Sequence, residues 1–293
     1  MLPRILVATL VATAALPGTA VLAADQPSSA EEALTTSFTT SFPSAALRSR
    51  LHFLVHLPAG YATSNRRYPV VYFLHGLPAG PTSYQSVSWV AAALDRTGLP
   101  AILIVPQGTQ TTNGDPEYHD WGPGRNWETA LAVELPRYVD AHFRTIRSRS
   151  GRAIIGVSAG GYGATILGLH HAATFEAIES WSGYFRPTDP TGQETLDVGT
   201  NSENAEASVH MLVPGLAGQL KSYPTLLAFY VGSGDPTFVP DNAQLNRELT
   251  AAGIPHLFEL YPGMHSVSLW EKHATAWLAL ALHRLSAPEP AQP

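Results

Sequence analysis

Short apolar runs alternate with helical patterns between residues 50 and 285, and this alternation constrains the fold more than any other feature of the chain. The runs are rich in Val, Ile and Leu and are bounded by Gly or Pro, as buried central strands are. Strands that alternate with helices predict an α/β fold, in which helices cover both faces of a mostly parallel sheet. The predicted buried strands are 69–74, 101–105, 153–157, 177–181 and 225–231.

Two further strands are expected, at 51–57 and at 256–261. The first alternates apolar and polar residues, which predicts an edge strand half open to water. The predicted helices lie at about 86–97, 126–143, 159–171, 241–252 and 268–284. Pro136 lies inside the second of these, so we expect that helix to kink or to begin again there. Asp241 and Gly253 predict the N-cap and the end of the fourth.

Both ends of the chain are expected to lie outside this domain. Residues 1–24 contain Arg4, then an apolar stretch, then small residues, which is the pattern of a secretory signal peptide. An uncleaved anchor is the alternative, but Pro17 and Gly18 break an apolar run that is shorter than the ~20 residues of a membrane span. We therefore expect an exported protein with no stable membrane insertion after cleavage.

The remaining boundaries follow from composition. Residues 25–49 are expected to form an N-terminal segment, 50–285 the folded domain and 286–293 a Pro-rich tail. Residues 186–222 interrupt the alternation with Pro, Gly and polar residues. They are expected to form an insertion, either a mobile lid or a plain surface loop.

Composition excludes several classes of function. The 293 residues include 17 Lys plus Arg against 23 Asp plus Glu, a net charge of -6, and no run of basic residues, so nucleic-acid binding is disfavoured. There is no Cys, which excludes disulfides, thiolate zinc sites and a cysteine nucleophile. Any nucleophile must therefore be an oxygen or a nitrogen.

Ser158 is the candidate nucleophile. It lies in the pattern G-x-S-x-G, from Gly156 to Gly160, at the point where the strand 153–157 turns into a helix. Such a turn holds a serine hydroxyl out of the sheet, and its small neighbours let the backbone approach. The helix that begins at Ala159 directs free N–H groups at charge that develops beside the hydroxyl. A plain serine in a glycine-rich turn is the alternative.

A serine nucleophile needs a base, and the base needs an acid to orient it. With this type of turn the chain order is Ser, then Asp or Glu, then His. Asp235 follows the strand 225–231, and His265 follows the strand 256–261. Taken singly, Asp235 reads as a turn former before proline and His265 as one of twelve histidines. Their position and order predict a triad of Ser158, His265 as base and Asp235.

The oxyanion donors are expected from two backbone N–H groups. Ala159 follows the nucleophile, and Leu77 lies in the loop 73–80 that follows an early strand. His75 in the same loop has no His or carboxylate spaced nearby as a metal ligand, so it is interpreted as a residue that structures the loop. No metal site is predicted.

The chain resembles the esterase family of α/β-hydrolases that includes esterase D and the antigen 85 mycolyltransferases. The resemblance covers about residues 50 to 285 and implies ester hydrolysis or acyl transfer through an acyl-serine, with no metal or organic cofactor. The residues that carry it are Leu74-His75-Gly76, Asn126-Trp127-Glu128 with Glu134-Leu135-Pro136, Ser158, Gly234-Asp235, and Gly263-x-His265-Ser266 with Trp270.

Three positions depart from the antigen 85 branch. The antigen 85 branch typically has an acidic residue where this chain has His75, an arginine where it has Pro78 and a tryptophan where it has Val267. These departures disfavour a trehalose mycolyltransferase and favour the general esterases of the family.

Substrate-side candidates lie in a Gly- and Pro-rich stretch that follows a strand. Tyr118, Trp121 and Arg125 are expected to line a pocket mouth suited to a sugar or aryl ester, and Trp270 is a further substrate-binding candidate. Trp127 in the same stretch is expected to pack against the sheet.

Three functions remain open from the sequence. The first is an exported serine esterase that acts on a small-molecule, lipid or sugar ester. The second is an acyltransferase that moves the acyl group to a cell-envelope sugar or lipid alcohol with the same residues. The third is a non-catalytic carbohydrate-binding protein on the same fold. The acyl chain, the alcohol and the oligomeric state are left open.

Overall fold

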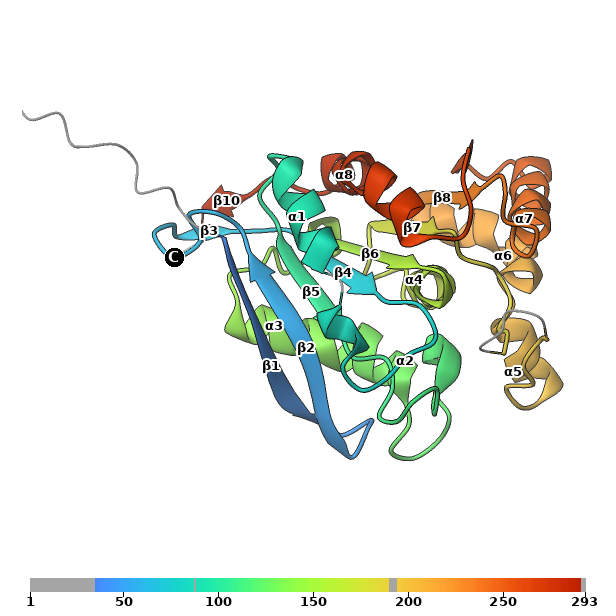
Figure 1. The fold of residues 1–293 in the computed structure, drawn as a ribbon, viewed down its shortest axis with the longest axis horizontal. Coiled ribbons are helices and arrows are strands. Elements are labelled where there is room, and N and C mark those ends of the chain that lie inside the picture. The colour runs from blue at the N-terminus through green and yellow to red at the C-terminus, as the bar shows by residue number, and fades with distance from the viewer. Residues whose placement is uncertain (1–34, 87, 190–193, 291–293) are drawn as a thin grey trace, which may run out of the picture. The chain divides into compact units, whose positions relative to one another are not determined.

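An eight-stranded sheet forms the centre of the domain in the computed structural model, which describes residues 35–86, 88–189 and 194–290 (Figure 1). The strand order is β1-β2-β5-β4-β6-β7-β8-β9. β1, β2 and β5 are antiparallel neighbours, and every pair from β5 to β9 is parallel. The mostly parallel sheet confirms the predicted α/β class. The strands are β1 (Thr36–Ser44), β2 (Ser49–Leu57), β4 (Val70–Leu74), β5 (Ile102–Pro106), β6 (Arg152–Val157), β7 (Ala177–Trp181), β8 (Leu226–Gly232) and β9 (Leu257–Tyr261).

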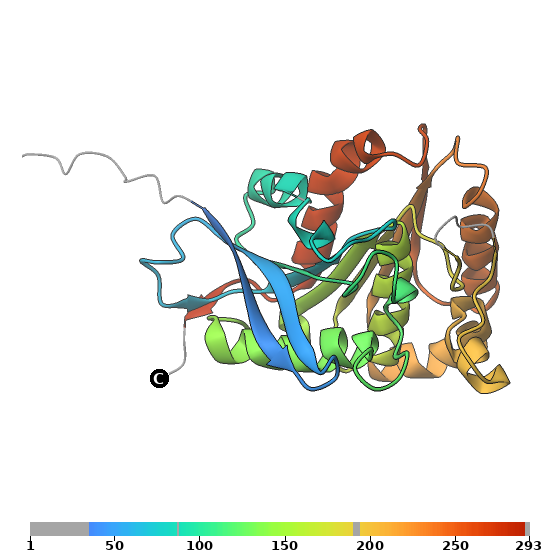
Figure 2. The ribbon, with the colours of Figure 1, turned by 60° about the horizontal axis from the view of Figure 1, so that its bottom comes forward.

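Helices cover both faces of this sheet (Figures 1 and 2). Side chains alternate between the two faces along each strand, so Val70 and Tyr72 of β4 lie in one core and Val71 and Phe73 in the other. The first core is closed by α2 (Trp127–Thr129), α3 (Leu135–His142), α4 (Ala159–His170), α6 (Val209–Ser222) and α7 (Val239–Ala251). The second is closed by α1 (Ser88–Arg96) and α8 (Val267–Arg284).

The domain extends beyond the expected boundary at residue 50. β1 pairs with β2 along its whole length, so β1 and not β2 is the edge strand. β1 is rich in Ser and Thr, and only its C-terminal end is buried, so it lacks the apolar pattern by which strands are recognised. Phe42 of β1 stacks on Tyr138 of α3 with ring centroids 4.5 Å apart.

The expected tail is also in contact with the domain. β10 (Glu289–Pro290) pairs antiparallel with β3 (Arg66–Arg67). Backbone pairing needs no apolar side chain, so composition gave no sign of it. The predicted signal peptide, residues 1–24, lies outside the described residues. Among the residues that are described, no helix has the length and apolarity to cross a membrane.

The described part of the predicted insertion is largely helical and is not a plain surface loop. α5 (Asn201–Glu206) begins with a capping box between Thr200 and Glu203. α6 follows and buries Val209, Val213 and Leu216. The sequence did not predict α6 because Pro214 lies inside it and proline disfavours a helix interior.

Two helix boundaries bear on the site. α7 begins at Val239, so Asp241 lies in its first turn and is not the N-cap expected from the sequence. The Asp241 carboxylate accepts a hydrogen bond from the backbone N–H of Phe185 instead. The pattern 126–143 is divided as expected near Pro136: a π-helical turn, Ala130–Glu134, separates α2 from α3.

Candidate active site

Ser158 lies on the sharp turn between β6 and α4. Its backbone is left-handed, with φ 57° and ψ -124°, a conformation that residues with a side chain rarely adopt. The turn is held because the Ser158 N–H donates to the carbonyl of Trp181 at 2.9 Å and the Ser158 carbonyl accepts from the N–H of Gly161 at 2.8 Å. Strain of this kind persists only where the surroundings over-determine it.

Small residues allow three backbone segments to meet at this turn. A Cβ on Gly156 would collide with the carbonyl of Gly160, and one on Gly160 would collide with the carbonyl of Leu74. A Cβ on Gly76 would lie 2.9 Å from the Cβ of Ser158. The loop after β4 is therefore packed directly against the serine.

The structure brings Ser158, His265 and Asp235 together. His265 lies 107 residues after Ser158 and 30 residues after Asp235 in the chain. His265 Nε2 lies 2.9 Å from Ser158 Oγ, and His265 Nδ1 lies 3.0 Å from Asp235 Oδ2. The order Oγ, imidazole, carboxylate is the arrangement of a serine, base and acid in series.

Asp235 is held as a carboxylate. Its burial alone would raise its pKa, but hydrogen bonds from His265 and from the N–H groups of Phe238 and Thr237 outweigh that effect and lower the pKa. Those two N–H groups donate to Oδ1, each at 3.0 Å, so Oδ2 is left for His265. An ionised Oδ2 accepts the Nδ1–H of His265, which leaves Nε2 as the acceptor of the Ser158 hydroxyl proton.

Two aromatic rings flank His265. The ring of Phe238 lies 5.0 Å from the imidazole, and that of Trp270 lies 5.2 Å away and perpendicular to it. Trp270 was expected on the substrate side and lies beside the base. The sequence analysis missed Phe238, although its place three residues after Asp235 puts it in the same loop.

His75 orients the loop that carries Leu77. Its Nδ1–H donates to the carbonyl of Gly76 at 3.0 Å. A planar trans peptide points its C=O and N–H in opposite directions, so holding the Gly76 oxygen also sets the direction of the Leu77 N–H. In the part of the chain that the structure describes, neither this N–H nor that of Ala159 donates a hydrogen bond. Both therefore remain available to an oxyanion.

His75 is 4% exposed, and burial lowers its pKa, so the ring is neutral. With the proton on Nδ1, the buried Nε2 can only accept, and no described residue donates a hydrogen bond to it. Among the described residues, no three His, Asp or Glu side chains are grouped as metal ligands. The geometry agrees with the interpretation of His75 as a residue that structures its loop.

Tyr118 lies inside the protein and not at a pocket mouth as expected. It is 4% exposed, its hydroxyl donates to the carbonyl of His75, and a Cβ on Gly163 would collide with its ring. Tyr118 has a left-handed backbone with φ 60°, which turns its side chain into this position. It supports the His75 loop from behind.

The other residues of that stretch divide between packing and ion pairing. Trp121 packs partly buried against the larger core, and Trp127 is fully buried as expected, with its Nε1–H donating to Asp115 at 3.0 Å. Arg125 is half exposed and is bound by Asp115 and by the carbonyl of Gly114. Burial thus contradicts the place predicted for Tyr118, whereas the substrate-side roles of Trp121 and Arg125 stay predictions.

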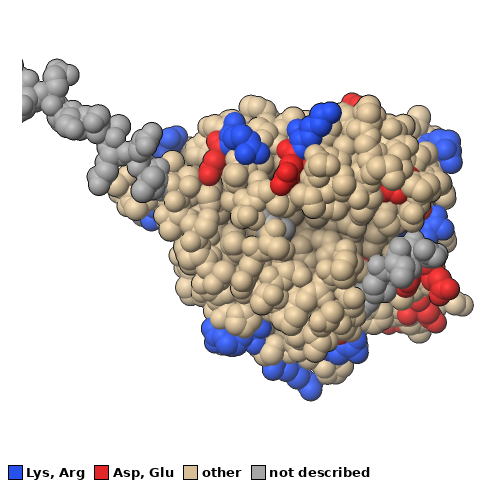
Figure 3. Space-filling view, in the orientation of Figure 1, with Lys and Arg blue, Asp and Glu red and all other residues tan. Residues whose placement is uncertain are grey.

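The surface over this region is poor in charge. Figure 3, in the orientation of Figure 1, shows a hollow near the carboxyl ends of the central strands. The Lys, Arg, Asp and Glu side chains visible on this face lie around its periphery and leave the hollow uncharged. Ligands of open parallel sheets bind at this edge.

The amino-acid sequence was compared with those of known proteins and protein families. Residues 44–279 match the sequence model of the family described as "Putative esterase". An esterase of Mycobacterium tuberculosis is 35% identical over 132 residues, which are 44% of this chain and 28% of the relative. S-formylglutathione hydrolase of Bos taurus is 26% identical over 162 residues, 49% of this chain and 55% of the relative.

A diacylglycerol acyltransferase/mycolyltransferase of Mycobacterium leprae is 27% identical over 161 residues, 48% of this chain and 47% of the relative. The chain thus spans about half or less of the length of these curated relatives. The sequence resemblance to esterase D and antigen 85 proteins is confirmed.

Solved structures share the fold. A ferulic acid esterase superposes with a TM-score of 0.76 at 23% identity, covering 87% of this chain and 100% of the other. S-formylglutathione hydrolase of Staphylococcus aureus gives 0.71 at 19% identity, covering 85% and 99%. The predicted α/β-hydrolase fold is confirmed.

Proposed function

Since this chain belongs to the esterase family, we propose that it hydrolyses carboxylic esters through an acyl-serine intermediate formed on Ser158. The observation that carries the proposal is the unbroken hydrogen-bond series from Ser158 Oγ through His265 to Asp235, at 2.9 and 3.0 Å. The exposed fraction of Ser158 is 8%, so little of this residue is in contact with bulk water.

In the first half of the reaction, His265 Nε2 takes the Ser158 proton while Oγ attacks the ester carbonyl. The carbonyl oxygen becomes an oxyanion, which the N–H groups of Leu77 and Ala159 stabilise. The positive end of the α4 dipole adds to this stabilisation because α4 begins at Ala159. The C–O bond to the alcohol then breaks, and His265 gives the proton to the leaving oxygen.

In the second half, water replaces the alcohol. His265 takes a proton from the water as its oxygen attacks the acyl carbon, and the bond to Ser158 Oγ breaks with return of the proton to Oγ. The products are a carboxylic acid and the free enzyme. The Asp235 carboxylate keeps the Nδ1–H of His265 in place through both halves.

Two measurements on one pair of proteins test the proposal. The wild type and Ser158→Ala are compared for turnover of p-nitrophenyl esters from acetyl to palmitoyl and for labelling by a fluorophosphonate. We expect the wild type to do both, and Ser158→Ala to lose labelling and at least ~10³-fold of kcat with an unchanged circular dichroism spectrum. Turnover that persists in Ser158→Ala would refute the assignment of the nucleophile.

The same measurements separate the alternatives. A wild type that is labelled but releases new ester instead of acid when alcohols are added would be an acyltransferase. A wild type that is neither labelled nor active would be a binding protein. The departures at His75, Pro78 and Val267 from the mycolyltransferase branch support hydrolysis.

A further inference from the structure

Phe238 contacts both the acid and the base of the site. Its backbone N–H donates to Asp235 Oδ1 at 3.0 Å, and its ring centroid lies 5.0 Å from that of the His265 imidazole. Phe238 is buried and directly precedes the first residue of α7. The reaction steps proposed for Ser158, His265 and Asp235 make no use of its ring.

We propose that Phe238 is a positioning residue for the base. Its ring keeps the His265 imidazole directed at Ser158 and stabilises the positive charge that the imidazole takes up during the reaction. The inference rests on the proposed esterase function and adds a residue to the same site. Three observations carry it: the weak support of His265 by its own loop, the fixed place of Phe238, and the aromatic character of their contact.

The loop that carries His265 gives the imidazole little support. Its neighbours Met264 and Val267 are exposed, and the His265 side chain is itself 29% exposed. The bond to Asp235 holds Nδ1, but a single hydrogen bond leaves the ring free to tilt about it. A misplacement of about 1 Å in a reacting group can cost ~10²-fold in rate, so contacts from other elements are needed to keep Nε2 in line.

The need is greatest in the acyl-enzyme. Ser158 Oγ is then bonded to the acyl group and no longer has a proton to share with His265. The imidazole must nevertheless keep its direction, because Nε2 has to take a proton from the attacking water. Side-chain packing against the ring is unchanged at this stage, whereas the hydrogen bond from the serine hydroxyl is gone.

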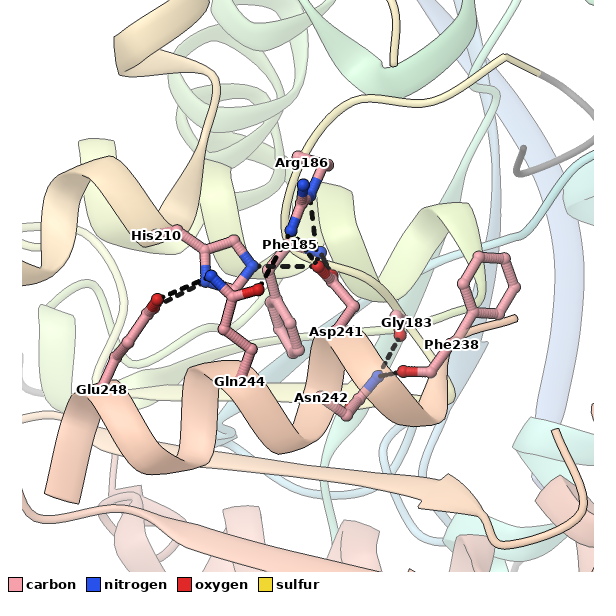
Figure 4. Close-up of polar contacts among 9 residues, drawn as sticks. All are labelled: Gly183, Phe185, Arg186, His210, Phe238, Asp241, Asn242, Gln244 and Glu248. Carbon is pink, nitrogen blue, oxygen red and sulfur yellow. Dashed lines mark hydrogen bonds and ion pairs between the residues drawn. The ribbon is translucent and has the colours of Figure 1, made fainter. Parts of the chain in front are cut away.

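The backbone of Phe238 is fixed by Asn242 (Figure 4). Asn242 Nδ2 donates to the carbonyl oxygens of Phe238 at 2.9 Å and of Gly183 at 2.7 Å. Asn242 is fully buried in α7, and Gly183 lies in the segment that follows β7. The start of α7 is therefore tied to a neighbouring element at the residue that contacts the base.

The ring of Phe238 is restricted by further aromatic contacts. The ring of Tyr184 lies 4.9 Å from it, and Tyr184 stacks on Tyr162 of α4 at 5.6 Å. The Tyr184 hydroxyl donates to Glu117 Oε1 at 2.6 Å, so Tyr184 is held at both its ring and its hydroxyl. A ring with such neighbours has little freedom to move, and it limits the movement of the imidazole that it contacts.

The aromatic character of Phe238 adds an electrostatic effect. His265 becomes a cation only when Nε2 takes the proton of Ser158 or of water. An aromatic ring within about 6 Å of a cation attracts it, and the 5.0 Å between Phe238 and His265 lies in this range. Because the charge develops in the transition state, the contact should raise kcat and leave substrate binding unchanged.

The test compares three variants with the wild type. Phe238→Leu keeps an apolar side chain and the backbone N–H to Asp235 but removes the ring. Phe238→Tyr keeps the ring. Phe175→Leu is the matched control, because Phe175 is also buried but contacts Tyr72 and precedes β7, at the sheet edge opposite the triad.

Two rates are measured in each protein, turnover of p-nitrophenyl acetate and labelling by a fluorophosphonate. We expect Phe238→Leu to lower kcat ~3- to 30-fold with KM changed by less than about twofold, and to slow labelling by a similar factor. Phe238→Tyr and Phe175→Leu should keep kcat within about twofold of the wild type. Circular dichroism checks that each variant is folded.

The pair of rates separates positioning from substrate binding. Labelling reports the attack by Ser158 alone, whereas turnover also includes the release of the acyl group by water, and His265 acts in both. A ring that only formed part of a substrate-binding wall would change KM instead. Its loss would then affect the ester and the phosphonate differently.

A loss of kcat in Phe238→Leu that is absent in Phe238→Tyr and in Phe175→Leu supports the inference. Wild-type kcat in Phe238→Leu, an equal loss in all three variants or in both Phe238 variants, or an effect on KM alone would overturn it and leave the esterase function standing. If Phe238→Leu fails to fold, Phe238→Met takes its place, since Met adapts to irregular spaces. A wild type that is neither labelled nor active would refute the proposed function itself.

Discussion

Gly76 and Ser158 are in such close contact that a Cβ on Gly76 would lie 2.9 Å from the Cβ of Ser158 and 3.1 Å from the carbonyl oxygen of Val157. Neither neighbour is the free end of a flexible side chain. The loop that carries Leu77 is therefore kept at its distance from the nucleophile by the absence of one methyl group.

Gly76→Ala tests this contact. The added methyl should displace the loop and with it the Leu77 N–H, so we expect kcat for a p-nitrophenyl ester to fall about 10²-fold, as for loss of one oxyanion donor. The measurement is kcat and KM at a fixed pH. Gly80→Ala in the same loop is the control, because a Cβ there meets nothing within 4 Å. Equal activity of the two variants would contradict the packing argument.

His75 should act through the Gly76 carbonyl. An Asn side chain places its amide N–H near the position of Nδ1, whereas Gln places it near that of Nε2. We therefore expect His75→Asn to retain kcat within about fivefold and His75→Gln to lose about 10²-fold, with little change in KM in either. A loss of kcat without a change in KM, together with the higher kcat of the Asn variant, would identify a positioning role for His75. Equal losses in both variants would show that His75 only fills space.

Asp235→Asn should leave the fold intact and remove most of the activity. An amide cannot stabilise the imidazolium that forms on His265, and its NH₂ group favours the wrong tautomer of the ring. We expect kcat to fall on the order of 10⁴-fold. Steady-state kinetics and fluorophosphonate labelling rate measure the effect, with Glu271→Gln, an exposed carboxylate of α8, as the control. A loss below tenfold would exclude Asp235 as the orienting acid.

His210 should make stability depend on pH. Its burial alone would lower its pKa, but Asp241 and Glu248, at 3.0 and 2.6 Å, outweigh that effect and raise it. A histidine with a pKa above its unfolded value of about 6.5 stabilises the fold fully below that pH. The contribution disappears as pH rises through the raised value.

His210→Gln should therefore lower the melting temperature more at pH 6 than at pH 9. A difference of about 1 kcal/mol corresponds to roughly 2–4 °C for a domain of this size. Asp241 has a lowered pKa, so the stability that it contributes is lost only as pH falls below about 3.8. The contribution of Asp241 is therefore the same at pH 6 and at pH 9. The same loss at pH 6 and pH 9 would contradict a charged His210.

Residues 153–171 show how much local sequence can decide. An apolar run, a G-x-S-x-G turn and a helical pattern specify strand, elbow and helix from neighbouring residues alone, and β6 and α4 are where the pattern put them. The order of Ser158, Asp235 and His265 along the chain was enough to name three side chains that lie in hydrogen-bond distance.

Other features needed the tertiary structure because they depend on partners far away in the chain. β1 is a strand because β2 pairs with it, not because its own residues alternate. Tyr118 is buried because Gly163 and His75 leave room and a partner for its ring. The sequence analysis placed Tyr118 at a pocket mouth because composition gives the chemistry of a side chain. Composition does not say whether that side chain points into the protein or toward solvent.

Local patterns in the chain were enough to select Ser158, Asp235 and His265, because each follows a strand and the carboxyl ends of parallel strands meet at one edge of the sheet. The surroundings of these three side chains could be known only from the folded chain. Arg186, His210 and Asp241, for example, form one ion-paired cluster although they come from the loop after β7, from α6 and from α7 (Figure 4). Their spacing and charge balance exist only once the chain is folded, because these segments are separate in sequence.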